Sequence, residues 1–405
     1  MTTTLTGDYT SLGGASLLFD FRFDHGNDTH DSLNATGAVF LDGSFVLNLL
    51  DVEHIMPGDF EYVVITGMGG ITDNGIELVV PDSAVMSWEL FASSDIEHTL
   101  RYSVDFSPSG LTGNHAAIGE HINQIQLAGG SDETDPITAM LVGLPDTDLL
   151  KAVYDRLSPH VYWSNQATRL FAGLAFDKTL HSCPVRDGDY RFTAEGECVW
   201  TSFNDREVTH TGEEGVLASN EQAQTVNVGY QKALTEHWHG ALSFGYEDSE
   251  LTIPMLAERN GHQYLFGAIL KGRYGPHKLS FSASAGTGSF DTRRYVALPT
   301  PNVVALGDRG FSIAAAHLQY SVEMGGDAWF IAPLIDLGYT EVDSDGFTET
   351  GTGSAELVIE DASTTYVTGR VAIKVGGEWL VGSGMLLRPF VDIGLTQSLD
   401  DETVE

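Results

Sequence analysis

Long runs of alternating apolar and polar residues fill the second half of the chain. In one of them, Leu279, Phe281, Ala283 and Ala285 fall on one face, and small polar residues fall between them. A period of two indicates a β-strand with one apolar face. Nine such strands of about ten or more residues are predicted, at 195–208, 223–234, 238–251, 262–274, 277–290, 310–325, 328–341, 363–375 and 385–396.

The length of these strands favours a transmembrane β-barrel. A strand of about 9–11 residues crosses the bilayer at a tilt, and lipid-facing and lumen-facing residues alternate along it. Soluble barrels and sandwiches also alternate, but strands in soluble proteins are nearer to about 5–6 residues. Aromatic residues at the strand ends suit the two membrane interfaces: Trp200, Tyr230, Trp238, Tyr246, Tyr274, Tyr320, Trp329, Tyr339 and Trp379.

Shorter strands, separated by turn residues, occupy the first part of the chain. Leu17, Phe19, Phe21 and Phe23 recur at every second position, and clusters of Gly, Asp and Asn between such runs are typical of turns. A stack of strands of this kind fits a β-helix or a sandwich. The pattern favours the β-helix, a solenoid, although no sharp repeat is visible in the sequence. The other predicted strands lie at 38–41, 44–49, 62–66, 75–80 and 101–106.

Helical spacing occurs only between these two β-rich blocks. Leu149, Val153 and Leu157 recur four residues apart. Asp146 and Asp148 lie where carboxylates stabilise a helix N-terminus. The predicted helices are 116–127, 137–144, 148–157 and 161–176. The pattern therefore divides the chain into residues 1–112, 113–193 and 194–405.

Short motifs follow one another in a fixed order along the chain. Gly7-Asp8-Tyr9 is followed by Gly13-Gly14, and Leu157-Ser158-Pro159 later precedes Tyr162. The last block carries Trp200, Gly229, Tyr230, Pro333, Tyr339, Glu349 and Gly351. In this order the motifs resemble the C-terminal region of a classical monomeric autotransporter of type V secretion.

The resemblance implies an all-β antiparallel transmembrane barrel at 194–405. It further implies a helical linker at 113–193, whose last helix threads the barrel lumen, and the terminal rungs of a β-helical passenger at 1–112. About twelve barrel strands are expected in the family, whereas nine are predicted here, and the chain starts without a signal peptide. We therefore expect a fragment truncated at both ends.

The function implied is that of an outer-membrane translocator, which anchors an extracellular passenger and helps to export it. The resemblance implies three partners: outer-membrane lipid, the chain's own passenger segment and the barrel assembly machinery. It also implies a monomer, no cofactor and no catalytic activity. Two alternatives stay open, namely a secreted β-rich adhesin without a membrane barrel and a hydrolase whose catalytic passenger lies upstream.

Cys183 and Cys198 lie where many members of this family carry a cysteine pair before the first strand. In the oxidising periplasm that the resemblance implies, we expect a disulfide; two unpaired thiols are the alternative. Closing a loop of about 15 residues would contribute roughly 3 kcal/mol of stability.

Several basic residues fall on polar positions that would face the barrel lumen: Lys271, Arg273, Arg370, Lys374 and Arg388. They could complement a central helix or an acidic passenger electrostatically. Alternatively, they form ordinary ion pairs inside the lumen with Asp336, Asp392 or Glu349.

Charge and motif content exclude other classes of function. The chain has 20 basic and 57 acidic residues, a net charge of −37, and residues 1–159 hold 24 of the acidic but only 4 of the basic ones. Nucleic acid is therefore an unsuitable partner, since binding phosphates needs clustered Lys and Arg. No nucleophile elbow, P-loop or zinc-protease motif occurs. His237 with His239, and Asp343 with Asp345, lack the further ligands that a metal site needs.

Overall fold

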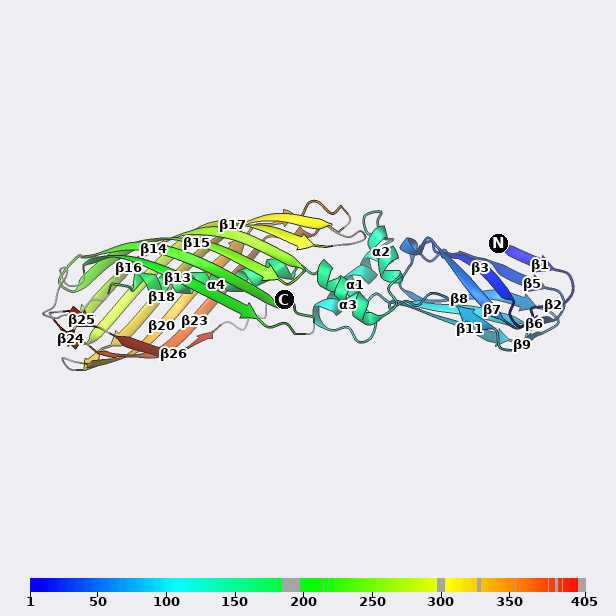
Figure 1. Cartoon of the computed structure of the whole chain (residues 1–405), viewed down its shortest axis with the longest axis horizontal. Coiled ribbons are helices and arrows are strands. Elements are labelled where there is room, and N and C mark those ends of the chain that lie inside the picture. Colours follow the sequence, from blue (N-terminus) through cyan, green and yellow to red (C-terminus); the bar gives the residue numbers. More distant parts are fainter. Residues whose placement is uncertain are drawn as a thin grey trace.

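The computed structural model describes residues 1–183, 197–213, 215–296, 303–325, 329–353, 355–377, 379–382, 385–387 and 389–399. The molecule is a rod with three parts (Figure 1). A stack of short strands lies at the N-terminal end, short helices lie in the middle, and a curled sheet surrounds a long helix at the other end. No helix among the described residues is long and apolar enough to cross a membrane.

The N-terminal stack is a parallel β-helix with three faces. Each face is a ladder of parallel strands, and one of them pairs Thr3 with Leu33 and Leu33 with Ile65, so the chain returns to the same face after 30 and then 32 residues. The solenoid, and not the sandwich, is therefore correct. The three ladders are β1 (Thr2–Leu5), β5 (Ser32–Ala35) and β8 (Gly58–Gly67); β2 (Tyr9–Thr10), β6 (Val39–Leu41) and β9 (Ile71–Asp73); and β3 (Ser16–Arg22), β7 (Ser44–Leu50) and β10 (Glu77–Val79).

Alternating apolar residues build the core of the β-helix. Phe19 and Phe21 of β3 point inward and are buried, and Phe19 stacks on Phe45 of the next rung at 4.4 Å between ring centroids. Strands β11 (Met86–Ser94) and β12 (Glu97–Val104) extend the first ladder as an antiparallel hairpin. The remaining short elements are β4 (Thr29–His30) and the 3₁₀ turn η1 (Val52–His54).

Four helices follow, close to the predicted positions. Asp146 caps the third by accepting a hydrogen bond from the Leu149 backbone N–H at 2.9 Å, which satisfies a free donor of the first turn. Of the residues that recur four apart, Val153 is buried and Leu149 is exposed, and Leu150 and Tyr154 are buried beside Val153. The helices are α1 (Gly113–Leu127), α2 (Asp135–Val142), α3 (Thr147–Leu157) and α4 (His160–Leu180).

In the described part of the chain, nine long antiparallel strands form the curled sheet, in chain order and next to their sequence neighbours. All nine predicted strands are present. Among the described residues, β13 and β26 are the two edges of the sheet and do not pair with each other. The strands are β13 (Cys198–His210), β14 (Ser219–Ala233), β15 (Trp238–Ile253), β16 (Ala257–Tyr274), β17 (His277–Tyr295), β18 (Val304–Val322), β20 (Trp329–Ser344), β23 (Ala362–Gly377) and β26 (Phe390–Ser398).

Five short strands lie beside this sheet among the described residues, and one of them, β19, pairs with it. Strand β19 pairs with the start of β20, and two small hairpins lie in the connections before β23 and before β26. These elements are β19 (Met324–Gly325), β21 (Phe347–Thr348), β22 (Val358–Ile359), β24 (Trp379–Val381) and β25 (Met385–Leu387).

The outer face of this sheet is apolar and its inner face is polar. On β14, Val226, Val228 and Tyr230 point outward and are about half exposed, while Thr225 and Asn227 point inward and are buried. This is the pattern of a strand between lipid and a polar lumen.

Trp200 differs from the prediction that it lies in the outer aromatic belt. It packs inside, beside Leu180 of α4 and Ala241 of β15. A Cβ atom on Gly229 of the neighbouring strand would lie only 2.1 Å from the indole ring. The indole therefore occupies the space that the missing side chain of Gly229 leaves on the inner face.

Candidate functional site: the barrel lumen and its helix

Helix α4 runs through the space enclosed by the curled sheet (Figure 1) and contacts β14, β15, β16, β17, β18 and β20. The helix can approach the wall closely because the wall carries glycines at the points of contact. A Cβ atom on Gly245 would lie 3.0 Å from the Phe176 ring of the helix, and one on Gly267 would lie 2.8 Å from it. Phe176 is buried together with Leu265 and Ile313, so this apolar contact fixes one face of the helix against the wall.

A charged cluster holds the middle of α4. Arg169 donates hydrogen bonds to Glu247 of β15 and Glu221 of β14, both at 2.9 Å. Arg259 of β16 donates to the other oxygen of Glu221 at 2.5 Å, and Arg206 of β13 reaches both glutamates at 3.1 Å. Four wall strands and the helix thus share one network.

This network is almost fully shielded from solvent. Arg169 is 1% exposed, Glu221 and Glu247 are 1% exposed, and Arg259 is 2% exposed. The Phe290 ring lies under both buried guanidinium groups, at 5.0 Å from Arg169 and 4.4 Å from Arg259. Such contacts partly replace water around a cation. Leaving one partner of a buried ion pair without the other costs about 3–5 kcal/mol. A shift of the helix would separate these partners, so the network specifies one position of the helix.

A second polar cluster closes the lumen on the side of the short helices. Glu349 has no exposed surface; it accepts a hydrogen bond from the Tyr162 hydroxyl of α4 at 2.6 Å and forms an ion pair with Arg294 of β17. Arg294 also donates to the Arg156 carbonyl of α3 at 2.6 Å. The cluster joins the barrel wall, the lumen helix and the helical segment before it.

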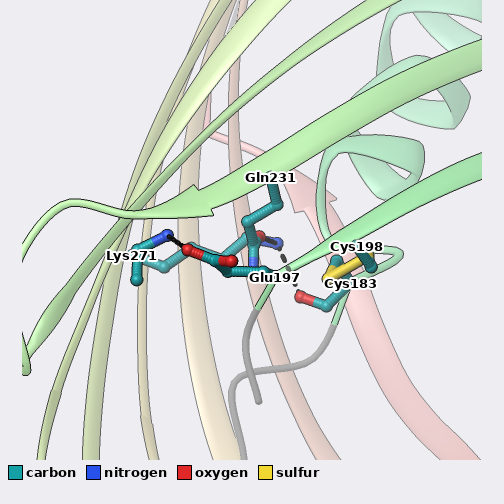
Figure 2. The surroundings of a disulfide bond; sticks show 6 residues. Cys183, Glu197, Cys198, Gln231 and Lys271 are labelled. Carbon is teal, nitrogen blue, oxygen red and sulfur yellow. Dashed lines mark hydrogen bonds between the residues drawn. A yellow bond between two sulfur atoms is a disulfide. The ribbon is translucent and has the colours of Figure 1, made fainter. Parts of the chain in front are cut away.

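The opposite end of the lumen carries the disulfide (Figure 2). Cys183 and Cys198 are joined, which ties the residues after α4 to the start of β13. The Lys271 ammonium group of β16 donates to the Cys183 carbonyl at 3.1 Å and to the Gln231 side chain at 2.8 Å. The chain leaving the helix is therefore fixed directly to β13 and β16, and through Lys271 to Gln231 of β14.

The other predicted lumen cations have separate partners. Arg370 forms an ion pair with Asp392 at 2.5 Å, which is one of the lumen pairings that the sequence analysis weighed. The Lys374 ammonium group lies 4.9 Å from the centre of the Phe390 ring. Arg273 donates to the Gly275 carbonyl at the turn after β16. Arg388 lies outside the described residues.

The family-matched positions divide between the two faces of the sheet. Tyr230, Pro333 and Tyr339 lie on the outer face, where each side chain is exposed. Gly351, at φ +106°, lies in the loop after β21, and its backbone N–H donates to Glu356 at 2.8 Å. Trp200, Gly229 and Glu349 are lumen positions.

Four arginines of these two clusters were not predicted as lumen residues from the sequence: Arg169, Arg206, Arg259 and Arg294. Arg206 shares its strand face with Trp200, and Arg259 shares its face with Lys271. Because Lys271 was predicted to face the lumen, strand parity could have placed Arg259 there as well. Trp200 was predicted to lie in the outer belt, so the same reasoning would have misplaced Arg206. Nothing in the sequence pairs Arg169 with Glu221, because those residues meet only when the helix lies inside the sheet.

Comparison with known proteins supports the geometry. The family model described as "Autotransporter beta-domain" matches residues 199–405, more than half of the chain. The chain belongs to the autotransporter family. Two solved structures are similar: the translocator domain of autotransporter NalP from Neisseria meningitidis and the beta domain of the Bordetella autotransporter BrkA.

These likenesses are distant in sequence. The NalP domain is 15% identical, with a TM-score of 0.51, over 60% of this chain and 81% of that one. The BrkA domain is 16% identical, with a TM-score of 0.39, over 50% of this chain and 80% of that one. No curated protein matches the chain. The first likeness concerns the fold, and the family match identifies this autotransporter as an outer-membrane translocator of type V secretion with a linked passenger exposed at the cell surface.

Proposed function

We propose that this structure represents the state after export, in which α4 occupies the lumen that the passenger has crossed. The observation that carries the proposal is the arginine–glutamate network around Arg169, because it fixes one position of a helix continuous with the exported segment. In this state the β-helix and the short helices lie outside the membrane, and the disulfide lies at the periplasmic end. The barrel contributes transport and anchoring, and no bond-making chemistry.

We also propose the partners of this translocator. Outer-membrane lipid covers the apolar outer face of the sheet, and a barrel assembly machinery inserts the strands. The translocator acts as a monomer. Nucleic acid is no partner, since the charge of −37 repels phosphate.

Membrane fractionation of cells that express the chain behind an export signal tests this proposal. We expect the protein in the outer-membrane fraction, with an electrophoretic mobility in SDS that changes on heating. We also expect external protease to reach an epitope placed before β1 on intact cells. Recovery in the soluble periplasm, without a heat-dependent mobility change, would instead support a β-rich adhesin and contradict the translocator.

We further propose that the β11–β12 hairpin starts the folding of the passenger at the cell surface. It is the strand pair nearest to the barrel in the chain, and in this proposal it emerges first, so that the rungs that follow it outward can add to it. Leu100 of β12 has no exposed surface, and Leu100→Ala would leave a cavity in the part that folds first.

A display experiment separates this role from general damage. Leu100→Ala should lower the protease-resistant passenger on intact cells while the barrel keeps its heat-dependent mobility. Ile96→Ala, at a 38% exposed position in the adjoining turn, is the matched control. Equal protease resistance in the two variants would refute the proposed starting point.

A further inference from the structure

Three metal-ligating side chains that are far apart in sequence meet inside the lumen. Asp177 comes from α4, His317 from β18 and Asp336 from β20, and all three are buried. One ligand atom from each lies within 4.8 Å of the other two. The cluster lies outside the arginine–glutamate network and has no part in it.

Hydrogen bonds within this cluster are few and long. The His317 Nδ1 atom lies 3.4 Å from Asp336 Oδ1, and the Gln319 amide lies 3.4 Å from the other oxygen of Asp336. His317 is only 4% exposed, so water does not reach its Nε2 atom freely. This atom has no hydrogen-bond partner among the described residues. Buried polar groups normally have a partner, so this imidazole is under-satisfied at Nε2, while its Nδ1, which faces Asp336 at 3.4 Å, is the atom placed to bind an ion.

The nearby basic side chains are engaged elsewhere. Arg370 is the cross-strand neighbour of Asp336, yet its guanidinium group donates to Asp392 at 2.5 Å. The Lys271 ammonium group donates to Gln231 and to the Cys183 carbonyl. In the part of the chain that the structure describes, neither cation forms an ion pair with the two carboxylates, and a divalent ion would supply charge of the sign they lack.

We propose that Asp177, His317 and Asp336 bind a divalent transition-metal ion of the zinc class. Imidazole nitrogen together with carboxylate oxygen suits Zn²⁺, whereas Mg²⁺ and Ca²⁺ prefer oxygen ligands alone. Ligands at about 2.1 Å in a tetrahedral zinc site lie roughly 3.4 Å apart. The separation of His317 Nδ1 from Asp336 Oδ1 equals that value, so small side-chain shifts would bring Asp177 into the same shell.

Neighbouring groups hold the Asp177 carboxylate in place. The Ser282 hydroxyl of β17 donates to it. His181, directly after the end of α4, lies 3.9 Å from its other oxygen and makes a 3.1 Å hydrogen bond with Ser280. Such outer contacts orient the ligands of a metal site and raise its affinity. Ser280, Ser282 and His181 are positioning residues in this proposal.

The bound ion would join the lumen helix to two strands of the wall. Any ligand that binds only the folded state stabilises that state according to its concentration relative to its Kd. Zinc would therefore raise the temperature at which α4 leaves the wall. This property is additional to export and does not rest on the proposed state after translocation.

Titration of the folded full-length chain in detergent micelles, after treatment with a chelator, tests the site. We expect one equivalent of Zn²⁺ to bind and to raise the temperature of the heat-dependent mobility change. An excess of Mg²⁺ should not compete. His317→Gln should weaken zinc binding by at least about tenfold. His262→Gln, on the exposed outer face of β16, is the matched control and should leave it unchanged.

X-ray absorption of the zinc-loaded wild-type chain keeps the test independent of whether the variant folds. One imidazole together with oxygen ligands is the expected shell. Three outcomes would each overturn the proposal. They are the absence of saturable zinc binding, equal zinc affinity in His317→Gln and wild type, and a shell of two or more imidazoles from exposed histidines. Failure of this site would leave membrane insertion and passenger display unchanged, so it is distinguishable from failure of the export proposal.

Discussion

The β-helix and the barrel place the same kinds of side chain on opposite sides. In the β-helix, Phe21 and Phe45 have no exposed surface. In the barrel, Phe244 and Phe281 are about half exposed on the outer face, while Arg169 is 1% exposed inside. Both regions alternate with a period of two, but their interiors have opposite polarity.

The surrounding medium accounts for this difference. The β-helix is surrounded by water, so burial of apolar surface stabilises it. The barrel wall is surrounded by lipid, and there is no hydrophobic gain from turning apolar side chains inward. Its interior therefore depends on polar groups that must find partners. Alternation identifies a strand, whereas the medium decides which face of the strand becomes the core.

The largest expected effect comes from removing a charge from the lumen network. Glu221→Gln leaves the two buried guanidinium groups of Arg169 and Arg259 and the partly buried one of Arg206 with one remaining carboxylate, Glu247. We expect a loss of about 3–5 kcal/mol in the free energy of unfolding of the barrel, measured by urea titration in micelles with the mobility change as readout.

Glu250→Gln, on an exposed position of β15, is the matched control and should be nearly neutral. If both variants lost the same stability, the polar interior would not be what holds the barrel.

A cavity in the apolar core should damage the other region selectively. Phe45→Ala removes a ring with no exposed surface that stacks on Phe19. The β-helix should lose about 3–4 kcal/mol, observed as an earlier loss of β-sheet circular dichroism, while the heat-dependent mobility of the barrel stays unchanged.

Leu18→Ala, at a position 66% exposed on the same face of the stack, provides the comparison and should have little effect. A simultaneous shift of both transitions in Phe45→Ala would show that the two regions unfold as one unit.

Breaking the disulfide should weaken the barrel end by a smaller amount. Cys183→Ser with Cys198→Ser opens a loop of 15 residues, which corresponds to roughly 3 kcal/mol in the chain-entropy model. Thermal unfolding should shift downward in the double variant, and a reducing agent should shift the wild type alone. Sensitivity of the double variant to the reducing agent would contradict this assignment.

The smallest expected effect is a pH dependence confined to the β-helix. Burial, and then the charge of Asp28, raises the pKa of Tyr62 to about 12, and burial and the same carboxylate raise the pKa of Tyr102. The folded state therefore holds these protons more tightly than the unfolded state. Its stability is complete below pH 10 and falls as the pH rises toward 12.

Tyrosinate absorbance recorded with circular dichroism checks this dependence. Asp28→Asn keeps the side-chain shape and removes the charge, so the ionisation should move to lower pH. An unchanged profile in Asp28→Asn would show that Asp28 does not set the pKa of these tyrosines.

The sequence was sufficient for the elements and their order, because period and turn residues act locally. All nine long strands and the four helices lie near their predicted positions. It was insufficient for contacts made by the helix inside the sheet, such as Arg169 with Glu221, since these depend on how far the wall curves. Trp200 shows the same limit, because its inward direction depends on the space beside Gly229 in the neighbouring strand.

The route of α4 through the lumen has a mechanical consequence. Fluid drag on a surface passenger pulls the chain outward along the rod, and so along the helix inside the sheet (Figure 1). Ion pairs that connect the side of the helix to the wall are then strained in shear and share the load, instead of opening one after another. At the far end the disulfide passes the remaining tension directly into β13, so the connection between the cell and its passenger resists force better than its equilibrium stability alone would indicate.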